Sequence, residues 1–253
     1  MFVGVGSVLA EVEPLQKHAW ELGAEISHIT YDEPDVMEEK GFMYGILGSY
    51  TYYGNLMLKA EGRFSYGQVD YKNSGTLNNI DDYMLEFRGL AGYNFPAFKA
   101  SIITPYIGFG YRYLNDDMSG MTTSTGALGY ERESNYYYSP IGIETITKLE
   151  NGWSIGVILE YDYFWKGIQK SHLSDAVAGV SDLENDQNDG YGLRGSIKFQ
   201  KKGEDYLIEP FIRYWDIEKS EEQAITYAGV IYGYGYEPEN DSTEFGIKFA
   251  VKF

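Results

Sequence analysis

The feature that most constrains the fold is the strict alternation of residue types over Thr243 to Phe253 (TEFGIKFAVKF). Successive side chains of a strand point to opposite faces, so this segment predicts a strand with one wholly apolar face. A strand in water would gain little stability from ending the chain on an exposed Phe that carries the free C-terminal carboxylate. We therefore expect the apolar face to contact something other than water. The apolar face would carry Phe245, Ile247, Phe249, Val251 and Phe253.

The same period of two recurs along the chain from Trp20 onward. It predicts an all-β fold, a closed antiparallel transmembrane β-barrel of about ten strands, with eight or twelve as alternatives. We expect a single barrel domain over residues 20–253. The expected strands are Trp20 to Tyr31, Gly41 to Tyr53, Leu56 to Tyr66, Leu85 to Phe95, Tyr106 to Leu114, Tyr136 to Lys148, Trp153 to Trp165, Tyr191 to Phe199, Tyr206 to Ile217 and Thr243 to Phe253.

The strand from Trp153 to Trp165 has the clearest pattern, with aromatic residues at both ends and aliphatic residues between them on one face. A strand that spans a bilayer places aromatic rings at the two membrane interfaces and aliphatic side chains in the hydrocarbon. A soluble sandwich has no reason to separate them in this way. We predict that the membrane-interface aromatics include Trp20, Tyr52, Trp153, Tyr163, Trp165 and Phe253.

The predicted connections alternate in length, as periplasmic turns and extracellular loops do in outer-membrane barrels. We therefore expect both termini on the periplasmic side and acidic loops outside the cell. Short turns are expected near Gly54, Ala97, Asn151 and Gly203, and long loops near Asp35, Gly75, Gly120, Asp182 and Ala228.

The first residues differ from the rest. Residues 1–10 (MFVGVGSVLA) are apolar and small, and Val8 to Ala10 fit the small-residue rule for signal-peptide cleavage, although a basic start is missing. We interpret them as the remnant of a secretory signal, with a loosely packed arm as the alternative. Residues 11–19 would form a periplasmic N-terminal arm.

Composition excludes several functions. The absence of cysteine removes disulfides, thiolate metal sites and thiol catalysis. A formal net charge of -18 argues against nucleic acid as a partner, because a phosphate backbone requires a basic surface. No run of about 18 apolar residues predicts a membrane helix. The 25 tyrosines suit a membrane–water interface, since each combines an apolar ring with a polar tip.

The terminal strand resembles the C-terminal strand by which the assembly machinery recognises bacterial outer-membrane β-barrels. Thr104 to Leu114, Tyr136 to Glu144 and Glu209 to Asp216 also look like strands of that Gram-negative family. The resemblance implies a location in the bacterial outer membrane and contact with its lipid and lipopolysaccharide. It also implies engagement of the assembly machinery through Thr243 to Phe253 and an extracellular ligand at the loops. It does not fix the function, because the family includes pores, adhesins, structural barrels and enzymes.

No catalytic or metal site is predicted. An omptin-like surface protease, also ten-stranded, needs an Asp–His pair facing a second Asp pair, and none of His18, His28 and His172 stands in such a motif. Nothing near His28 or His172 matches the His–Ser arrangement of lipid-modifying barrels. The acidic stretch 182–188 lacks the Gly and terminal Glu of a calcium loop, so we interpret it as a flexible loop. We expect a protein that is not an enzyme and needs no cofactor or metal.

The face opposite the apolar one carries charges of both signs, which in a narrow barrel must be paired or hydrated. If they interlock, the barrel is a structural or adhesin-like platform that works through its loops, and we favour this interpretation. The alternative is a narrow porin-like channel for ions or small solutes. A soluble lipocalin-like barrel would reverse the two faces. The residues predicted to face the lumen are Lys59, Glu61, Arg63, Glu86, Arg88, Arg112, Glu144, Glu160, Asp162, Arg194, Lys198, Glu209, Arg213, Glu244 and Lys248.

Overall fold

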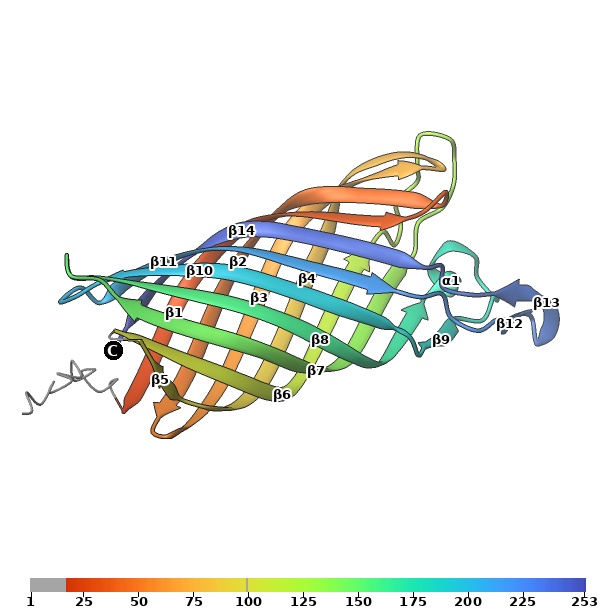
Figure 1. The fold of residues 1–253 in the computed structure, drawn as a ribbon. Coiled ribbons are helices and arrows are strands. Elements are labelled where there is room, and N and C mark those ends of the chain that lie inside the picture. The colour runs from red at the N-terminus through yellow and green to blue at the C-terminus, as the bar shows by residue number, and fades with distance from the viewer. Residues whose placement is uncertain (1–16, 99) are drawn as a thin grey trace, which may run out of the picture.

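The computed structural model describes residues 17–98 and 100–253, and the predicted signal remnant therefore lies outside the described residues. The described chain is built of strands and one helical turn (Figure 1). The elements are β1 (His18–Glu33), β2 (Met37–Tyr53), β3 (Leu56–Asn73), β4 (Gly75–Tyr93), β5 (Phe95–Ala97), β6 (Ser101–Asp117), β7 (Glu131–Lys148), β8 (Trp153–Ser171), α1 (Leu173–Ala176), β9 (Leu183–Gln187), β10 (Gly190–Lys201), β11 (Tyr206–Ile217), β12 (Gln223–Tyr227), β13 (Val230–Gly235) and β14 (Asn240–Lys252). Within the described residues, no helix is long and apolar enough to cross a membrane.

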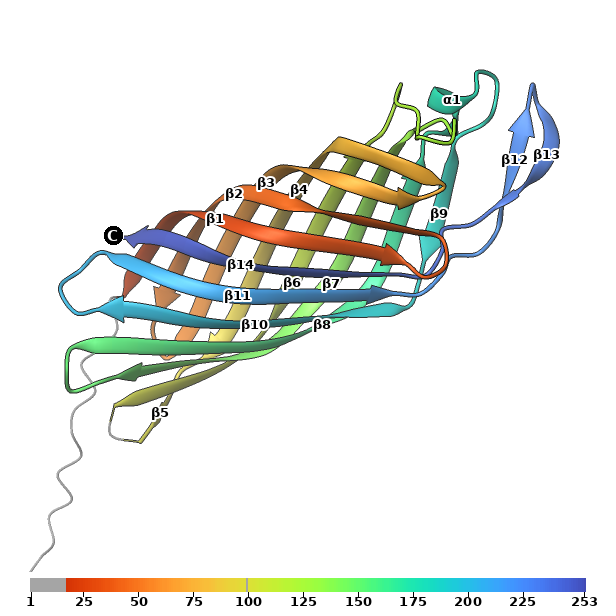
Figure 2. The same cartoon turned by 90° about the horizontal axis from the view of Figure 1, so that it is seen from above.

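Ten of these strands close into an antiparallel barrel, which confirms the predicted fold class (Figures 1 and 2). The order around the barrel is β1, β2, β3, β4, β6, β7, β8, β10, β11 and β14. The last strand pairs with the first, from Glu21 opposite Lys252 to Asp32 opposite Asp241. Closure leaves no free edge in the barrel wall.

The two faces of β1 show why the sequence alternates. Trp20 and Leu22 point outward and are 57% and 61% exposed, whereas Glu25 and Ser27 point into the lumen and are 4% and 2% exposed. The outer face of the barrel is apolar and the inner face is polar, which is the reverse of a soluble barrel. The lipocalin-like alternative therefore does not describe this chain. The outer face is what a strand surrounded by lipid requires.

Two of the predicted long loops are instead tight turns on tall hairpins. The long loop predicted near Gly75 is replaced by a tight turn, because β3 and β4 join at Ser74 beside Gly75, which has a φ of 105°. β1 and β2 likewise join through a short turn in which Asp35 has a φ of 63°. The prediction was wrong there because strands continue above the lipid, where outward side chains such as Lys40 are polar and the alternation disappears.

The remaining long connections contain their own structure. β8 continues to Ser171 and is followed by α1 and by β9, which pairs back onto β8. The connection between β11 and β14 contains the hairpin of β12 and β13, which projects beyond the barrel at the end opposite the C-terminus (Figure 1). Sequence alternation identified neither feature. Both lie at the end of the barrel that we predict to be extracellular, and on that prediction we call this end extracellular and the end that holds the C-terminus periplasmic.

The aromatic residues predicted at the membrane interfaces lie at opposite ends of the strands. At the end that holds the C-terminus, Trp20 and Phe253 pair through two backbone hydrogen bonds of 3.0 and 2.9 Å. Tyr52 and Trp153 lie at this end, at the last residue but one of β2 and the first residue of β8. Tyr163 and Trp165 lie on the outer face of β8 toward the opposite end, with their rings 6.2 Å apart.

Candidate functional site

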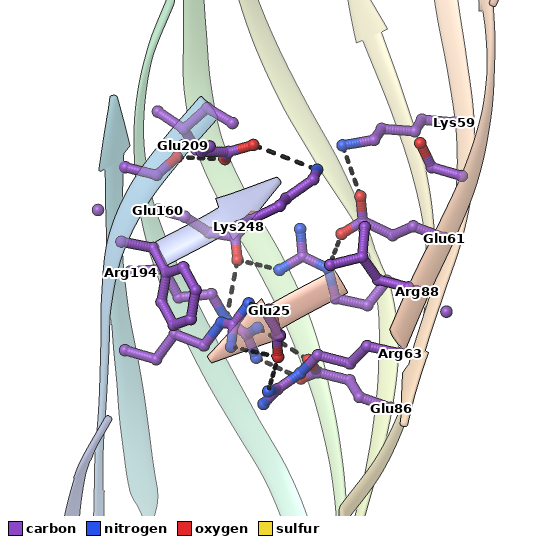
Figure 3. Close-up of a pocket in the computed structure, with 18 of the residues that line it drawn as sticks. Glu25, Lys59, Glu61, Arg63, Glu86, Arg88, Glu160, Arg194, Glu209 and Lys248 are labelled. Carbon is purple, nitrogen blue, oxygen red and sulfur yellow. Dashed lines mark hydrogen bonds and ion pairs between the residues drawn. The ribbon is translucent and has the colours of Figure 1, made fainter. Parts of the chain in front are cut away.

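Charged side chains from seven of the barrel strands meet inside the lumen (Figure 3). Because inward residues alternate with lipid-facing ones, the charges that one strand contributes lie two or four residues apart. We call this group the lumen network. It comprises Glu21, Glu25, Lys59, Glu61, Arg63, Glu86, Arg88, Glu160, Asp162, Arg194, Lys198, Glu209, Arg213, Glu244 and Lys248.

Arg63 on β3 is the centre of the network half nearer the extracellular end. Its guanidinium lies 2.7 Å from Glu86 on β4, 3.1 Å from Glu25 on β1 and 3.2 Å from Glu244 on β14. Arg213 on β11 binds the last two carboxylates as well, at 3.0 and 3.1 Å. One cation therefore ties together β14, β1, β3 and β4, which lie within one run of five neighbouring strands, and its side chain is 7% exposed.

Arg194 on β10 extends the network across the lumen. It lies 2.5 Å from Glu86, 3.2 Å from Glu160 and 2.6 Å from Asp162. Glu160 also pairs with Arg88, which in turn lies 2.5 Å from Glu61. The ion pairs form an unbroken chain from the wall formed by β3 and β4 to the wall formed by β8 and β10.

A separate layer of pairs lies closer to the periplasmic end. Glu21 lies 3.3 Å from both Lys198 and Lys248, and the second lysine lies 3.2 Å from Glu209. The hydroxyl of Ser196 donates a 2.7 Å hydrogen bond to Glu209. Carboxylates and ammonium groups in this layer therefore neutralise each other across β1, β10, β11 and β14.

The structure places every residue predicted to face the lumen inside the barrel, but two of them lie outside the network. Glu144 is buried and lines the cavity at the periplasmic end. Arg112 is buried among aromatic rings, with its guanidinium carbon 5.4 Å from the ring of Trp215 and 5.9 Å from that of Tyr136. Its Nε has no hydrogen-bond partner within the described residues. Arg112 therefore makes cation–π contacts where the other arginines of the lumen form ion pairs.

Above the lumen network, two apolar clusters fill most of the interior, together with the buried polar side chains of Asp82 and Arg112. One cluster gathers around Met43, Ile80 and Met84 and a second around Tyr138 and Trp215, and Leu114 packs against both. We call these two clusters the apolar plug. The rings of Tyr138 and Trp215 are 4.9 Å apart, and the Tyr138 hydroxyl donates a 2.5 Å hydrogen bond to Glu86. The plug thus rests directly on the lumen network. Sequence reasoning missed it because it assigned only charged residues to the interior.

The space left in the lumen is divided, and it becomes smaller from the periplasmic end toward the plug. A cavity of about 510 Å³ opens at the periplasmic end beside Glu21, Tyr53 and Lys198. A cavity of about 100 Å³ lies within the lumen network, and a third of about 30 Å³ lies between Ile29 and Val69 of the plug and the carboxylates of Glu39 and Asp116. A water molecule occupies about 30 Å³ in the liquid, so the upper space holds very little water.

Acidic residues cover the extracellular end of the plug. Arg132 lies 2.7 Å from Glu33 and 3.6 Å from Asp116. Glu237, in the connection between β13 and β14, is buried near this group, and burial raises the pKa of its carboxyl to about 7 against the opposing charge of Arg132. Its backbone N–H donates a 2.8 Å hydrogen bond to the hydroxyl of Ser220, which closes the base of the extracellular connection.

The histidines do not form a shared site. His18 bonds to Tyr50 at 2.7 Å, and His28 packs between Phe42 and Phe245. His172 lies 2.9 Å from Glu133. Partial burial opposes its protonation, but this hydrogen bond and the nearby carboxylates outweigh burial and raise the pKa of the imidazole. Within the described residues, no group of three or more His, Asp or Glu is arranged to hold a metal ion.

Comparisons with known proteins agree with this architecture. The outer membrane protein beta-barrel domain family matches residues 2–186 of the chain. The outer membrane protease OmpT from Escherichia coli has a similar fold, with a TM-score of 0.59, 9% identity, and coverage of 93% of this chain and 96% of that one.

More distant matches include the translocator domain of the autotransporter NalP from Neisseria meningitidis and OprG from Pseudomonas aeruginosa. Their TM-scores are 0.45 and 0.37, with 13% and 12% identity, over 93% and 96% of this chain and 89% and 99% of theirs. No curated protein matches the sequence. The chain belongs to the outer-membrane β-barrel family and is a protein of the bacterial outer membrane.

Proposed function

We propose that this protein is a non-enzymatic surface-interaction barrel whose lumen is sealed and whose extracellular connections carry the function. The observation that supports the proposal most strongly is the filling of the lumen, with the lumen network below and the apolar plug above. In a surface-interaction protein the barrel serves as a rigid support, and a filled interior stiffens that support.

Energetics disfavour passage of solutes. An ion crossing the lumen would have to separate guanidinium groups from two or three carboxylates each, as at Arg63 and Arg194. Buried pairs of this kind are costly to separate, since removing one partner by substitution costs about 3–5 kcal/mol. Above that layer, the ion would meet the methionines and aromatic rings of the plug, which offer weak ligands at best.

The absence of an enzymatic role is part of the same proposal. Each carboxylate of the lumen network pairs with at least one cation, and we therefore assign none of these carboxylates to acid–base work on a substrate. We further propose that the outer face contacts outer-membrane lipid and lipopolysaccharide, and that Thr243 to Phe253 engages the assembly machinery during insertion.

Shortening the extracellular connections is expected to abolish attachment of cells that display the protein. In the test variant, residues 221–239 and 173–182 are each replaced by short Gly/Ser turns. In the control, Glu150 and Asn151 of a periplasmic turn become Gly and Ser. Attachment to surfaces coated with extracellular polypeptides is measured, and heat-modifiable gel mobility verifies folding. Equal attachment by wild type and the shortened variant would rule out the proposed role.

A further inference from the structure

The hairpin of β12 and β13 offers an open strand edge. It projects past the rim of the barrel in both views (Figures 1 and 2). β13 pairs with β12 on one side, and within the described residues no strand pairs with its other side. The opposite edge of β12 is already covered by the segment 179–181, because Val180 forms a bridge with Tyr227 and Gly179 accepts a 3.0 Å hydrogen bond from Ala228.

The turn of the hairpin fixes which backbone groups face this open edge. Ala228 and Gly229 both have positive φ, 49° and 80°, as in a two-residue type I′ turn. In such a turn the flanking residues Tyr227 and Val230 form a hydrogen-bonded pair, so the next pair, Thr226 and Ile231, does not exchange hydrogen bonds.

The surroundings of Thr226 agree with this assignment. Its N–H donates to the Ser181 hydroxyl at 2.9 Å, and its carbonyl accepts from the Ser181 N–H at 2.8 Å, both on the side away from β13. By the symmetry of an antiparallel pair, the N–H and carbonyl of Ile231 point away from β12, toward the open edge. A further strand could bond to them.

The side chains around this edge favour contact with another chain. Val230 is 71% exposed and Tyr232 is 82% exposed, and residues 223–236 contain no charged residue and no proline. Natural proteins commonly block edge strands with Lys, Pro or a bulge. The hairpin has a bulge between Ile225 and Thr226, but Val230 and Ile231 lie on the turn side of it.

The charge around the hairpin indicates which kind of polypeptide would bind its open edge. Exposed carboxylates outnumber cations beside the uncharged tip, with Glu218, Glu221 and Glu222 before it and Glu239 after it, against the one exposed lysine of these two flanks, Lys219. A second copy of this chain would bring two acidic rims together, and the phosphates of a lipid headgroup would be repelled. A polypeptide with basic residues on either side of an apolar stretch complements both the rim and the tip.

We propose that the open edge of β13 binds an extended segment of another protein, apolar at its centre and rich in Lys or Arg at its ends, which adds as a third strand. Backbone hydrogen bonds to Ile231 supply affinity, and the acidic rim selects the partner. This inference rests on the proposed surface-interaction function, but it can fail while that function stands, since attachment could use another part of the extracellular connections.

The test uses the full chain refolded in neutral detergent and a fluorescent synthetic peptide of alternating Val and Thr with two Arg at each end. Ile231→Pro removes the outward N–H without removing a bond to β12, and Ile231→Thr changes the side chain but keeps that N–H. Fluorescence anisotropy is expected to show binding to wild type and to Ile231→Thr, and about tenfold weaker binding to Ile231→Pro. A peptide capped with Glu should not bind.

Three results would overturn the proposal. They are absence of binding to wild type, equal binding by the Pro and Thr variants, and equal binding of the Arg-capped and Glu-capped peptides. Sedimentation of the same samples provides a further test. Dimers of wild type that disappear in Ile231→Pro would assign the edge to a second copy of this chain and contradict the choice of a foreign partner.

Discussion

Replacing Arg63 by Met is expected to lower the free energy of unfolding of the refolded barrel by about 3–5 kcal/mol. Arg63 holds Glu25, Glu86 and Glu244 together at distances of 2.7 to 3.2 Å, and its side chain is 7% exposed. Met fills similar volume but leaves the three carboxylates with less compensating charge in a poorly hydrated interior. Urea unfolding in detergent, followed by tryptophan fluorescence, measures the change.

The matched control is Lys40→Met, which breaks an exposed pair with Glu38 in which the side chains are 47% and 36% exposed. Such a pair contributes about 0–1 kcal/mol, so this variant should unfold like the wild type. Adding Glu25→Gln to Arg63→Met should restore part of the lost stability, because it removes one uncompensated charge. Equal effects of Arg63→Met and Lys40→Met would show that the lumen charges are hydrated rather than interlocked.

Gly110→Val is expected to destabilise the barrel by about 3 kcal/mol through overpacking and a lost hydrogen bond. A Cβ atom at Gly110 would lie 2.2 Å from the ring of Tyr138, which is fully buried. To make room, the ring must leave its contact with Trp215 and its bond to Glu86. The substitution therefore disrupts the apolar plug and the lumen network at the point where they meet.

Gly89→Val provides the comparison, since a Cβ at Gly89 meets no heavy atom within 4 Å. Gly89 is also a strand glycine, on β4, and adding a β-branched side chain there should be neutral or slightly stabilising. Thermal unfolding of the two variants, monitored by heat-modifiable mobility, separates the effects. Similar midpoints for both variants would show that the plug is loosely packed and would weaken the account of a sealed lumen.

The strand pattern made much of the fold predictable. A lipid-facing strand must be apolar at every second residue, and this requirement appears directly in Phe245, Ile247 and Phe249 and in the strand from Trp153 to Trp165. The same reasoning located the charged face. It did not include Glu21 and Glu25 of β1 among the lumen residues, although both are partners of cations in the lumen network.

The rest depended on register and on the lumen, which local alternation does not encode. Arg63 and Glu244 are far apart in sequence and meet only because β14 closes onto β1. The plug includes Met43 and Met84, whose side chains point into the lumen. A prediction that places only polar residues in the lumen gives these methionines no role. Above the lipid, alternation is no longer required, and therefore the tall β3–β4 hairpin was predicted as a loop.

The measurement that tests the sealed lumen most directly is single-channel recording of the refolded protein in a planar bilayer, with Arg112→Ala beside the wild type and a known porin as a positive control. Arg112 lies within the plug against Trp215. The account predicts no discrete conductance steps from wild-type protein whose folding is verified by heat-modifiable mobility. Discrete steps whose size changes in Arg112→Ala would contradict it and would show that the interior forms a pore.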